Sequence, residues 1–339
     1  MPLRGKVGDV GQIDQELVGC NLTRGVALIS IRPQWSATYC KQIIASCSSI
    51  SRMEQLMNGS ALQEIPIATL RSFKIPLPPT RAEQTAIATA LSDMDALIEG
   101  VEKLLEKKRR IKQGAMQELL TGKRRVSGFE SQKGFQQTEV GAIPKDWSVA
   151  DLGALVEKFV NGGTPSTQHS EYWKGDIPWI TGADILNQKI AVIRRYITNE
   201  AVQNSSTNVI KRGKLLFVSR TGVGKLAIAP FDIAISQDFT GIYNKPDLLD
   251  ITFLFWFLNF IQKELLAQNQ GTSIQGITRS TLSSIKIVLP YTRAEQTAIA
   301  AILSDMDKEI EKIETQLTKY RKLKTGMMQE LLTGKKRLV

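Results

Sequence analysis

The sequence has few of the residues that metal sites and nucleophilic active sites use. It has one histidine, His169, in a polar loop, and three cysteines, Cys20, Cys40 and Cys47, that form no C-x-x-C pair. A clustered His/Cys metal site is therefore excluded. A Ser–His or Cys–His catalytic system would have to use His169, and no nucleophile motif accompanies it. The cysteine usage predicts free thiols in a reducing compartment.

Long hydrophobic runs and nucleotide-binding loops are also missing. The most apolar stretch, Ile251–Ile261, is about half the length that a bilayer crossing needs, and the first residues form no apolar signal region. We therefore expect a cytoplasmic protein. The glycine-rich run Gly222-Val-Gly-Lys225 departs from the phosphate-loop pattern at Ser219 and Leu226, and no G-x-G-x-x-G opens a helix after a strand. The sequence thus predicts no catalytic residues and no cofactor of its own.

What the sequence does have is one long segment written twice. TRAEQTAIATALSDMD at Thr80–Asp95 returns as TRAEQTAIAAILSDMD at Thr292–Asp307, and the register of 212 residues holds to the end of both copies. Such a repeat indicates a duplicated structural unit. Proline precedes each copy and glycine closes it, which is typical of helix boundaries. About forty residues at 1.5 Å each give a rod of roughly 60 Å.

The apolar residues of each copy follow the alternating three- and four-residue spacing of a coiled-coil seam. In the second copy the seam begins with Ile299, Leu303 and Met306, and in both copies lysines such as Lys112 and Lys324 interrupt it. A narrow seam needs a partner helix, and the other copy is the nearest one. We expect the two helices to pack antiparallel around an approximate two-fold axis. The simpler alternative is a dimerisation coiled coil.

The remaining chain predicts an α+β protein, because short strands and glycine-rich turns alternate with a few helices. The segment 1–79 matches only the second half of 141–291, and Val26–Ile31 and Ser36–Met57 are its expected strand and helix. The predicted organisation is a half-domain at 1–79, a long helix at 80–126, a linker at 127–140, a complete domain at 141–291 and a second long helix at 292–339.

A net charge of +11 and a pI near 9.5 favour a polyanionic partner, with nucleic acid first. The best candidate contact is the turn from Arg220 to Lys225, because arginine bonds guanine in two places and lysine neutralises phosphate. A solvated hairpin tip would have the same residues. Trp179 could stack on a base but is typical of a core residue. The candidate DNA-binding residues are Ser219, Arg220, Thr221, Lys225, Gln237, Asp238, Lys174, Thr181, Lys6 and Arg24.

Several motifs, in this order and with the helix repeat, resemble the specificity (S) subunits of type I restriction–modification systems. The matching pieces are Ile143-Pro-x-x-Trp147, Gly162-Gly-Thr-Pro165, Tyr172…Gly175-x-Ile-Pro-Trp179, Ser219-Arg…Gly224-Lys225, Leu289-Pro290…Glu295-Gln296…Ile299-Ala300…Leu303-x-x-Met-Asp307 and Leu331-Leu-x-Gly334.

The resemblance implies α+β target-recognition domains separated by two long antiparallel helices that form a coiled-coil spacer. Each domain would read one half of a split site on double-stranded DNA. The spacer would dock DNA methyltransferase (M) subunits, and motor-nuclease (R) subunits would join through them. S-adenosylmethionine, ATP and Mg²⁺ would belong to those partners, so the S subunit would be non-catalytic.

The segment 1–79 departs from the family pattern, because it corresponds to the C-terminal half of a recognition domain. We expect that a companion polypeptide completes it, that two copies pair, or that the gene is a remnant. Two alternatives remain open for the whole chain. One is a specificity subunit of a related system with a fused methyltransferase-nuclease, and the other is a coiled-coil scaffold that binds no DNA.

Overall fold

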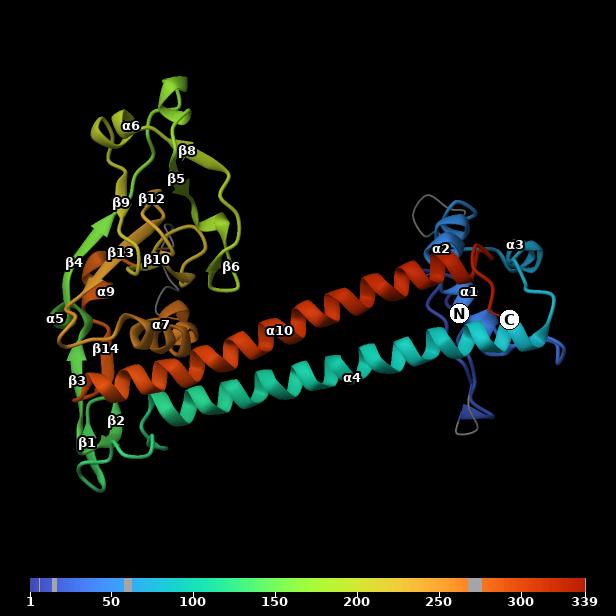
Figure 1. Cartoon of the computed structure of the whole chain (residues 1–339), viewed down its shortest axis with the longest axis horizontal. Helices are drawn as coiled ribbons and strands as arrows, with labels where there is room; N and C mark the ends of the chain where they lie inside the picture. The colour runs from blue at the N-terminus through green and yellow to red at the C-terminus, as the bar shows by residue number, and fades with distance from the viewer. Residues whose placement is uncertain (6, 14–16, 58–62, 268–275, 339) are drawn as a thin grey trace. The chain divides into compact units, whose positions relative to one another are not determined.

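The structure, a computed structural model, describes residues 1–5, 7–13, 17–57, 63–267 and 276–338 (Figure 1). It contains two compact units. Unit 1 comprises Met1–Lys107 and Ile310–Val339, and unit 2 comprises Lys108–Glu309. Each long helix is therefore shared between the units, with residues 81–107 of α4 and 310–331 of α10 in unit 1 and the remainder of both helices in unit 2.

The two long helices form as predicted. They are α4 (Arg81–Leu120) and α10 (Arg293–Leu331). The hydroxyl oxygens of Thr80 and Thr292 accept hydrogen bonds from backbone N–H groups three residues later, at 3.2 and 3.4 Å. Gly122 and Gly334 follow the two helices with φ of +69° and +72°. Both are conformations that glycine adopts without strain, so the chain leaves each helix at the same repeat position.

Within each unit the halves of α4 and α10 pack antiparallel, which confirms the expected orientation. In unit 1, Arg321 of α10 pairs with Glu102 of α4 at 2.6 Å, and Lys324 pairs with Asp95 at 2.5 Å. In unit 2, Lys108 of α4 pairs with Glu309 at 2.6 Å. Later residues of one helix thus lie opposite earlier residues of the other in both units.

The lysines that interrupt the seam are placed by the same ion pairs. Lys112 of α4 bonds Asp307 of α10 in unit 2, and its repeat equivalent Lys324 bonds Asp95 in unit 1. The side chain of Lys112 is 19 % exposed. In each copy a partly buried lysine replaces an apolar residue of the seam. Because the lysine needs the carboxylate opposite it, the ion pair favours one register between α4 and α10.

A buried glutamine joins each long helix to its unit. Gln84 and Gln296, repeat equivalents, are both 0 % exposed. Gln84 accepts a hydrogen bond from the N–H of Ser36 at 2.9 Å, and Gln296 accepts one from Asp250 at 2.8 Å. Ser36 and Asp250 are the N-cap residues of α1 and α7. The same amide therefore fixes the start of a domain helix in both units.

The further helices that the structure describes in unit 1 are α1 (Ala37–Ile44), α2 (Cys47–Glu54) and α3 (Ile67–Ser72). The single helix expected over Ser36–Met57 is wrong, because Ser46 caps a second helix. Its backbone is extended, with ψ of 147°, and its hydroxyl accepts from the N–H of Ser49. Of the residues that a single helix would direct inward, Tyr39, Ile43 and Ile44 are buried, whereas Cys47 and Leu56 are exposed.

The strand expected at Val26–Ile31 does not form. Val26 makes one isolated bridge to Pro2, and Ala27 donates to the carbonyl of Met1 at 2.8 Å. Proline has no N–H with which to continue such a ladder. The apolar composition of this run predicted a strand, but the described residues form no partner strand beside it.

The strands of the described residues lie in unit 2. They form a four-stranded sheet β11-β10-β13-β4, a second four-stranded sheet β8-β5-β12-β9, and the two-stranded pairs β14-β3, β1-β2 and β6-β7. Only the β5–β12 pair is parallel among the strand pairs of the described residues. The strand bounds are β1 (Phe135–Thr138), β2 (Gly141–Pro144), β3 (Trp147–Asp151), β4 (Val156–Asn161), β5 (Ile177–Ile180), β6 (Ile185–Leu186), β7 (Lys189–Ile190), β8 (Arg195–Ile197), β9 (Asn208–Ile210), β10 (Leu215–Val218), β11 (Leu226–Ile228), β12 (Ile233–Ile235), β13 (Phe239–Asn244) and β14 (Lys286–Pro290).

The helices of unit 2 are short apart from its shares of α4 and α10. The 3₁₀ turns are η2 (Ser170–Trp173) and η3 (Gly182–Asp184), and the α-helices are α5 (Leu152–Leu155), α6 (Asn199–Gln203), α7 (Ile251–Phe260), α8 (Gln262–Ala267) and α9 (Arg279–Ser283). The α+β class is confirmed. The apolar run at Ile251–Ile261 forms α7, a buried helix as expected. No helix among the residues of known placement could span a membrane.

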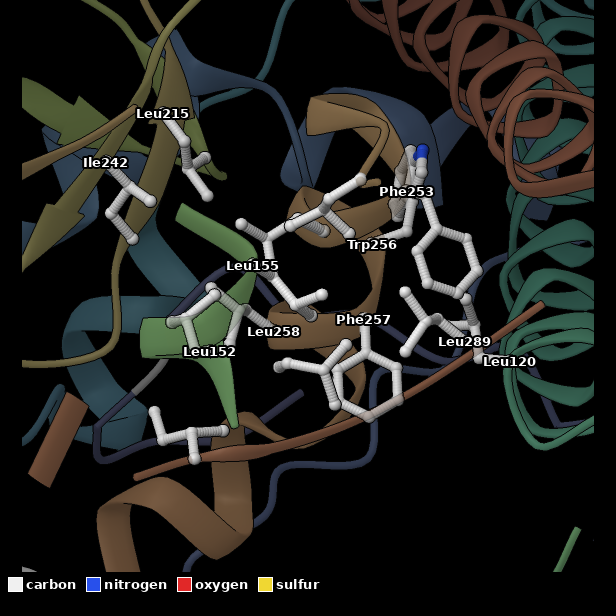
Figure 2. Close-up of a cluster of buried hydrophobic side chains, with 14 of the residues drawn as sticks. Leu120, Leu152, Leu155, Leu215, Ile242, Phe253, Trp256, Phe257, Leu258 and Leu289 are labelled. Carbon is white, nitrogen blue, oxygen red and sulfur yellow. The ribbon is translucent and has the colours of Figure 1, made fainter. Parts of the chain in front are cut away.

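The main core of unit 2 forms around α7. Phe253, Leu254 and Leu258 are 0 % exposed, and Phe257 and Leu289 are 4 % exposed. Figure 2 shows Leu120, the last residue of α4, directed toward the same cluster as these side chains. Trp256 donates to the hydroxyl of Ser304 at 3.0 Å, which holds α7 against the start of α10. The last turn of α4 and the first turns of α10 thus pack in this hydrophobic core.

The predicted linker at 127–140 is structured at its end. Phe135–Thr138 forms β1, which makes an antiparallel hairpin with β2. Gly141, the first residue of β2, has φ of +107°. The polar composition of this segment indicated a loop, but a two-stranded ladder needs only backbone groups and tolerates polar side chains on its open faces.

An ion cluster joins this segment to the helix pair. Arg125, which follows α4, donates to Asp146 at 2.6 and 3.0 Å and to Glu295 of α10 at 2.8 and 2.9 Å. Burial alone raises the pKa of Asp146, but hydrogen bonds from Arg125 and Ser131 outweigh it and hold the pKa well below its usual value.

We predict that Leu303→Ala lowers the free energy of unfolding by about 2–5 kcal/mol, because Leu303 is 0 % exposed in the seam. The matched control is Ile111→Ala on α4, where the side chain is 46 % exposed. That change should stay within about 0.5 kcal/mol. Urea unfolding followed by circular dichroism measures both. Equal losses would contradict the placement of the seam.

We predict that Asp146→Asn flattens the acid side of the stability profile. The pKa of Asp146 is lower in the folded protein than in the unfolded chain, so unfolding takes up a proton at low pH. The stabilisation that Asp146 provides is complete above its pKa in the unfolded chain, about 4, and is lost as the pH falls toward its pKa in the folded protein. Urea midpoints measured from pH 6 to pH 3 should fall less steeply in the variant; parallel profiles would contradict this role.

Candidate nucleic-acid interface

The turn between β10 and β11 presents the main candidate residues. The two strands are antiparallel, and Gly222 and Gly224 have φ of +87° and +85°. Arg220 and Thr221 are exposed at the tip. A phosphate loop would lead from a strand into a helix, whereas this turn joins two strands. The predicted hairpin turn is therefore confirmed, and its shape gives no phosphate cradle.

A second loop, between β12 and β13, holds the base of this turn. The carbonyl oxygen of Asp238 accepts from the N–H of Ser219 at 2.7 Å and from the N–H of Arg220 at 3.3 Å. The hydroxyl of Ser236 donates to the Asp238 carboxylate at 3.2 Å. Gln237 is exposed and accepts from the hydroxyl of Thr164. These bonds bring Ser219, Arg220, Gln237 and Asp238 together at one edge.

A third loop follows β5 and packs against the tip of the turn. Thr181 donates through its N–H and its hydroxyl to one carboxylate oxygen of Asp184, at 2.8 and 2.9 Å. A Cβ at Gly182 would lie 2.6 Å from the carbonyl oxygen of Thr221, so only glycine fits there. The ammonium of Lys225 donates to the carbonyl of Gly182 at 2.9 Å. Thr181 and Lys225 therefore shape the loops through internal bonds.

A fourth loop, after β4, depends on equally close backbone contact. A Cβ at Gly162 would lie 2.2 Å from the carbonyl oxygen of Ser236. Trp179 donates to the carbonyl of Gly163 at 3.1 Å and is 2 % exposed, which confirms it as a core residue. Four loops thus meet at the edge that we call the reader edge. Its exposed side chains are Arg220, Thr221, Gln237 and Thr164.

Lys174 lies in a different part of unit 2. It follows η2 and lines a cavity of about 620 Å³ with Trp173, Arg194 and Arg195. The guanidinium of Arg195 lies 5.8 Å from the Trp173 ring centroid. The sequence reasoning missed Arg194 and Arg195. Their adjacent positions, with Arg194 before β8 and Arg195 at its start, were the available signal, and only the fold brings them beside Lys174.

Two other candidates are not part of the reader edge as the structure describes it. Lys6 falls outside the described residues. Arg24 belongs to unit 1, where it is exposed in a turn. In the described ranges no group of histidine, cysteine, aspartate or glutamate side chains could hold a metal ion. His169 is exposed, and its Nδ1 lies 2.9 Å from a carboxylate oxygen of Glu171.

The family model for the type I restriction modification DNA specificity domain matches residues 4–108 and 144–319. These ranges cover most of the chain and include parts of both compact units. The chain belongs to this family. The resemblance drawn from the motifs is thereby confirmed.

Named relatives in the same family include two proteins of Methanocaldococcus jannaschii. The MjaX specificity subunit is 33 % identical over 287 residues, which are 84 % of this chain and 64 % of that protein. The type I restriction enzyme MjaIX specificity subunit is 35 % identical over 54 % of this chain and 43 % of its own length. The chain thus spans less than two thirds of the length of either relative.

A solved structure supports the fold independently of sequence. The type I restriction-modification system S subunit from M. genitalium is similar with a TM-score of 0.61, over 88 % of this chain and 73 % of that one. Its identity of 15 % is too low to carry over residue roles. The likeness therefore shows that this chain has the fold of a type I specificity subunit.

We predict that Lys225→Met destabilises the protein by about 1.5–3 kcal/mol, because it removes a charged donor from the part-buried carbonyl of Gly182. The control, Lys174→Met, changes an exposed lysine and should stay within about 0.5 kcal/mol. Thermal and urea unfolding of both variants provide the comparison. A neutral Lys225→Met would show that the bond does not brace the turn.

Proposed function

We propose that this chain is the DNA sequence-specificity subunit of a type I restriction–modification complex, and that unit 2 reads part of the target sequence on double-stranded DNA. The observation that carries the proposal is the reader edge. Four loops are held by backbone bonds and close glycine contacts, and they leave Arg220, Thr221 and Gln237 exposed. Guanidinium, hydroxyl and amide groups are the chemistry that reads base edges in the major groove.

The charge of the chain supports the same partner. A net charge of +11 favours association with phosphates in any sequence, while the loop side chains would supply discrimination. Lys174, Arg194 and Arg195 form a second basic group in unit 2, beside Trp173. Arg194 also pairs with the carboxylate of Asp184 at 3.2 Å, which fixes its position. We propose that this group contacts the DNA backbone, because clustered cations position a duplex more readily than they specify a base.

The helix pair is proposed to dock M subunits and to set the spacing between the DNA segments that are read. The support is an ion pair between the helices that recurs at equivalent positions. The Lys112–Asp307 pair in unit 2 has its equivalent in Lys324–Asp95 in unit 1. Surfaces that recur in both units suit two copies of one partner. Motor-nuclease subunits would then join through the M subunits.

The chain itself is proposed to do no chemistry. S-adenosylmethionine would bind the methyltransferase, and ATP with Mg²⁺ would bind the motor-nuclease. Methyl transfer by the purified chain alone would contradict this assignment.

Methylome sequencing tests the proposal. A host that carries this gene and its methyltransferase partner should gain methylation at one defined motif, and a host with the methyltransferase alone should not. Fluorescence anisotropy on a duplex with that motif should then show binding that weakens as salt rises. An unchanged methylome and no salt-sensitive binding would favour the scaffold alternative.

We predict that Arg220→Ala weakens binding to the motif by about 1–3 kcal/mol, or roughly 5- to 150-fold, and relaxes the preference at one base position. The charge-matched control is Arg124→Ala, because Arg124 is 75 % exposed in unit 2 and pairs with Glu118 outside the reader edge. It should alter affinity little and leave the motif unchanged. Identical motifs for Arg220→Ala and wild type would remove Arg220 from the reading group.

A further inference from the structure

The segment before each long helix has nearly the same sequence and a different environment. Lys286–Pro290 reads KIVLP and forms β14, which pairs along all five residues with β3. Lys74–Pro78 reads KIPLP at the equivalent repeat position in unit 1. There it forms no strand with any described residue. Ile287 and Leu289 are 0 % and 4 % exposed, whereas their equivalents Ile75 and Leu77 are only half-buried.

The prolines of KIPLP still leave it able to pair. In unit 2, Leu152 donates to the carbonyl of Ile285, and Tyr291 donates to the carbonyl of Asp146. Residues whose backbone groups bond the neighbouring strand alternate along an antiparallel ladder. The N–H groups of Ile287 and Leu289 therefore point toward β3, and that of Val288 points away from it. Pro76 takes the place of Val288. The N–H groups of Ile75 and Leu77 therefore remain available on the side where a partner strand would lie.

The glycine after each long helix shows the same contrast. A Cβ at Gly122 would lie 2.4 Å from the Pro144 ring and 3.4 Å from the Trp147 ring, because both pack there. Its equivalent, Gly334, has no heavy atom of the described chain within 4 Å of that position. A cavity of about 210 Å³ opens at Gly334. It is lined by the KIPLP prolines, Tyr39, Glu83, Leu331 to Thr333 and Arg337.

The charges differ in the same way. Arg125 lies between two carboxylates, Asp146 and Glu295, and its side chain is 12 % exposed. Its equivalent, Arg337, bonds Glu83 and remains 55 % exposed. In unit 2 the second carboxylate comes from the segment that also supplies Pro144, Trp147 and β3. Unit 1 has the groups that would contact such a segment, which are the N–H groups of Ile75 and Leu77, Gly334 and the guanidinium of Arg337.

We propose that this cavity and the open edge at Lys74–Pro78 form a binding site for an extended polypeptide segment of the Ile-Pro-x-Asp-Trp type from a partner polypeptide. Its proline and tryptophan pack on Gly334, its aspartate bonds Arg337, and the following residues pair with Ile75 and Leu77 as a strand. The chain's own segment of this type is engaged in unit 2, where Trp147 is 0 % exposed. The inference does not depend on DNA recognition.

A labelled synthetic peptide with the sequence of residues 140–151 tests the site on the full chain by fluorescence anisotropy. We expect saturable binding with one peptide per chain. A peptide carrying both D146A and W147A should bind at least tenfold more weakly. Absence of saturable binding, or equal binding of the two peptides, would overturn the proposal.

Paired protein variants locate the bound peptide. Arg337→Ala should weaken binding at least tenfold, whereas the equivalent Arg125→Ala in unit 2 should leave it unchanged. The opposite pattern would mean that the peptide exchanges into unit 2, and it would overturn the site in unit 1.

A second pair of variants tests the strand edge without touching the ion pair. Ile75→Pro removes a ladder N–H and should weaken binding at least tenfold, while Pro76→Val restores the unit 2 sequence and should keep it. Circular dichroism confirms folding of each variant. Equal affinity of Ile75→Pro and Pro76→Val would show that the peptide does not add a strand there.

Discussion

The narrow apolar seam of the long helices is the constraint on which both units depend. A seam two residues wide in each heptad cannot be buried by a short domain, so each half of α4 packs against a half of α10. Because the sequence repeats after 212 residues, one set of contacts occurs twice. Gln84 and Gln296 then tie a domain helix to the start of each long helix. The helix pair and the domain cores therefore form one packed structure in each unit.

The reader edge is held by contacts among its own loops. Its loops lack long helices of their own, and they are held by carbonyl groups and glycine contacts of neighbouring loops. Asp238 holds the base of the turn, while Lys225 and Gly182 hold its tip. Loops fixed in this way can present Arg220 without paying its ordering cost at the moment of binding. This arrangement suits a site that must discriminate between similar ligands.

The two units show that identical residues acquire different roles from their surroundings. Arg125 and Arg337 occupy the same repeat position, and each bonds the glutamate at the start of the opposite helix. In unit 2, burial alone would lower the pKa of Arg125, but hydrogen bonds to Glu295 and to a third group, Asp146, raise it. In unit 1 the same guanidinium stays half-exposed. Sequence repetition thus preserves the helix ends more strictly than the domains around them.

Local patterns of the sequence were sufficient for the elements that local physics determines. The periodic seam predicted α4 and α10 and their antiparallel pairing, and the glycines after Arg220 predicted a hairpin turn. Both depend on residues near one another in the chain or on a repeat visible in it. The motifs Gly162-Gly-Thr-Pro165 and Ile143-Pro-x-x-Trp147 also indicated the family, because their order along the chain is specific.

Only the tertiary structure decided which polar groups stay free at the surface. Arg220, Thr181 and Lys225 are equally polar in the sequence, yet Arg220 is exposed while Thr181 and Lys225 bond within the loops. The grouping of Arg194 and Arg195 with Lys174 was likewise invisible in the sequence. Strand formation at β1 and its failure at Val26–Ile31 have the same cause. A strand and a surface site both require partners distant in the chain, and those partners exist only after folding.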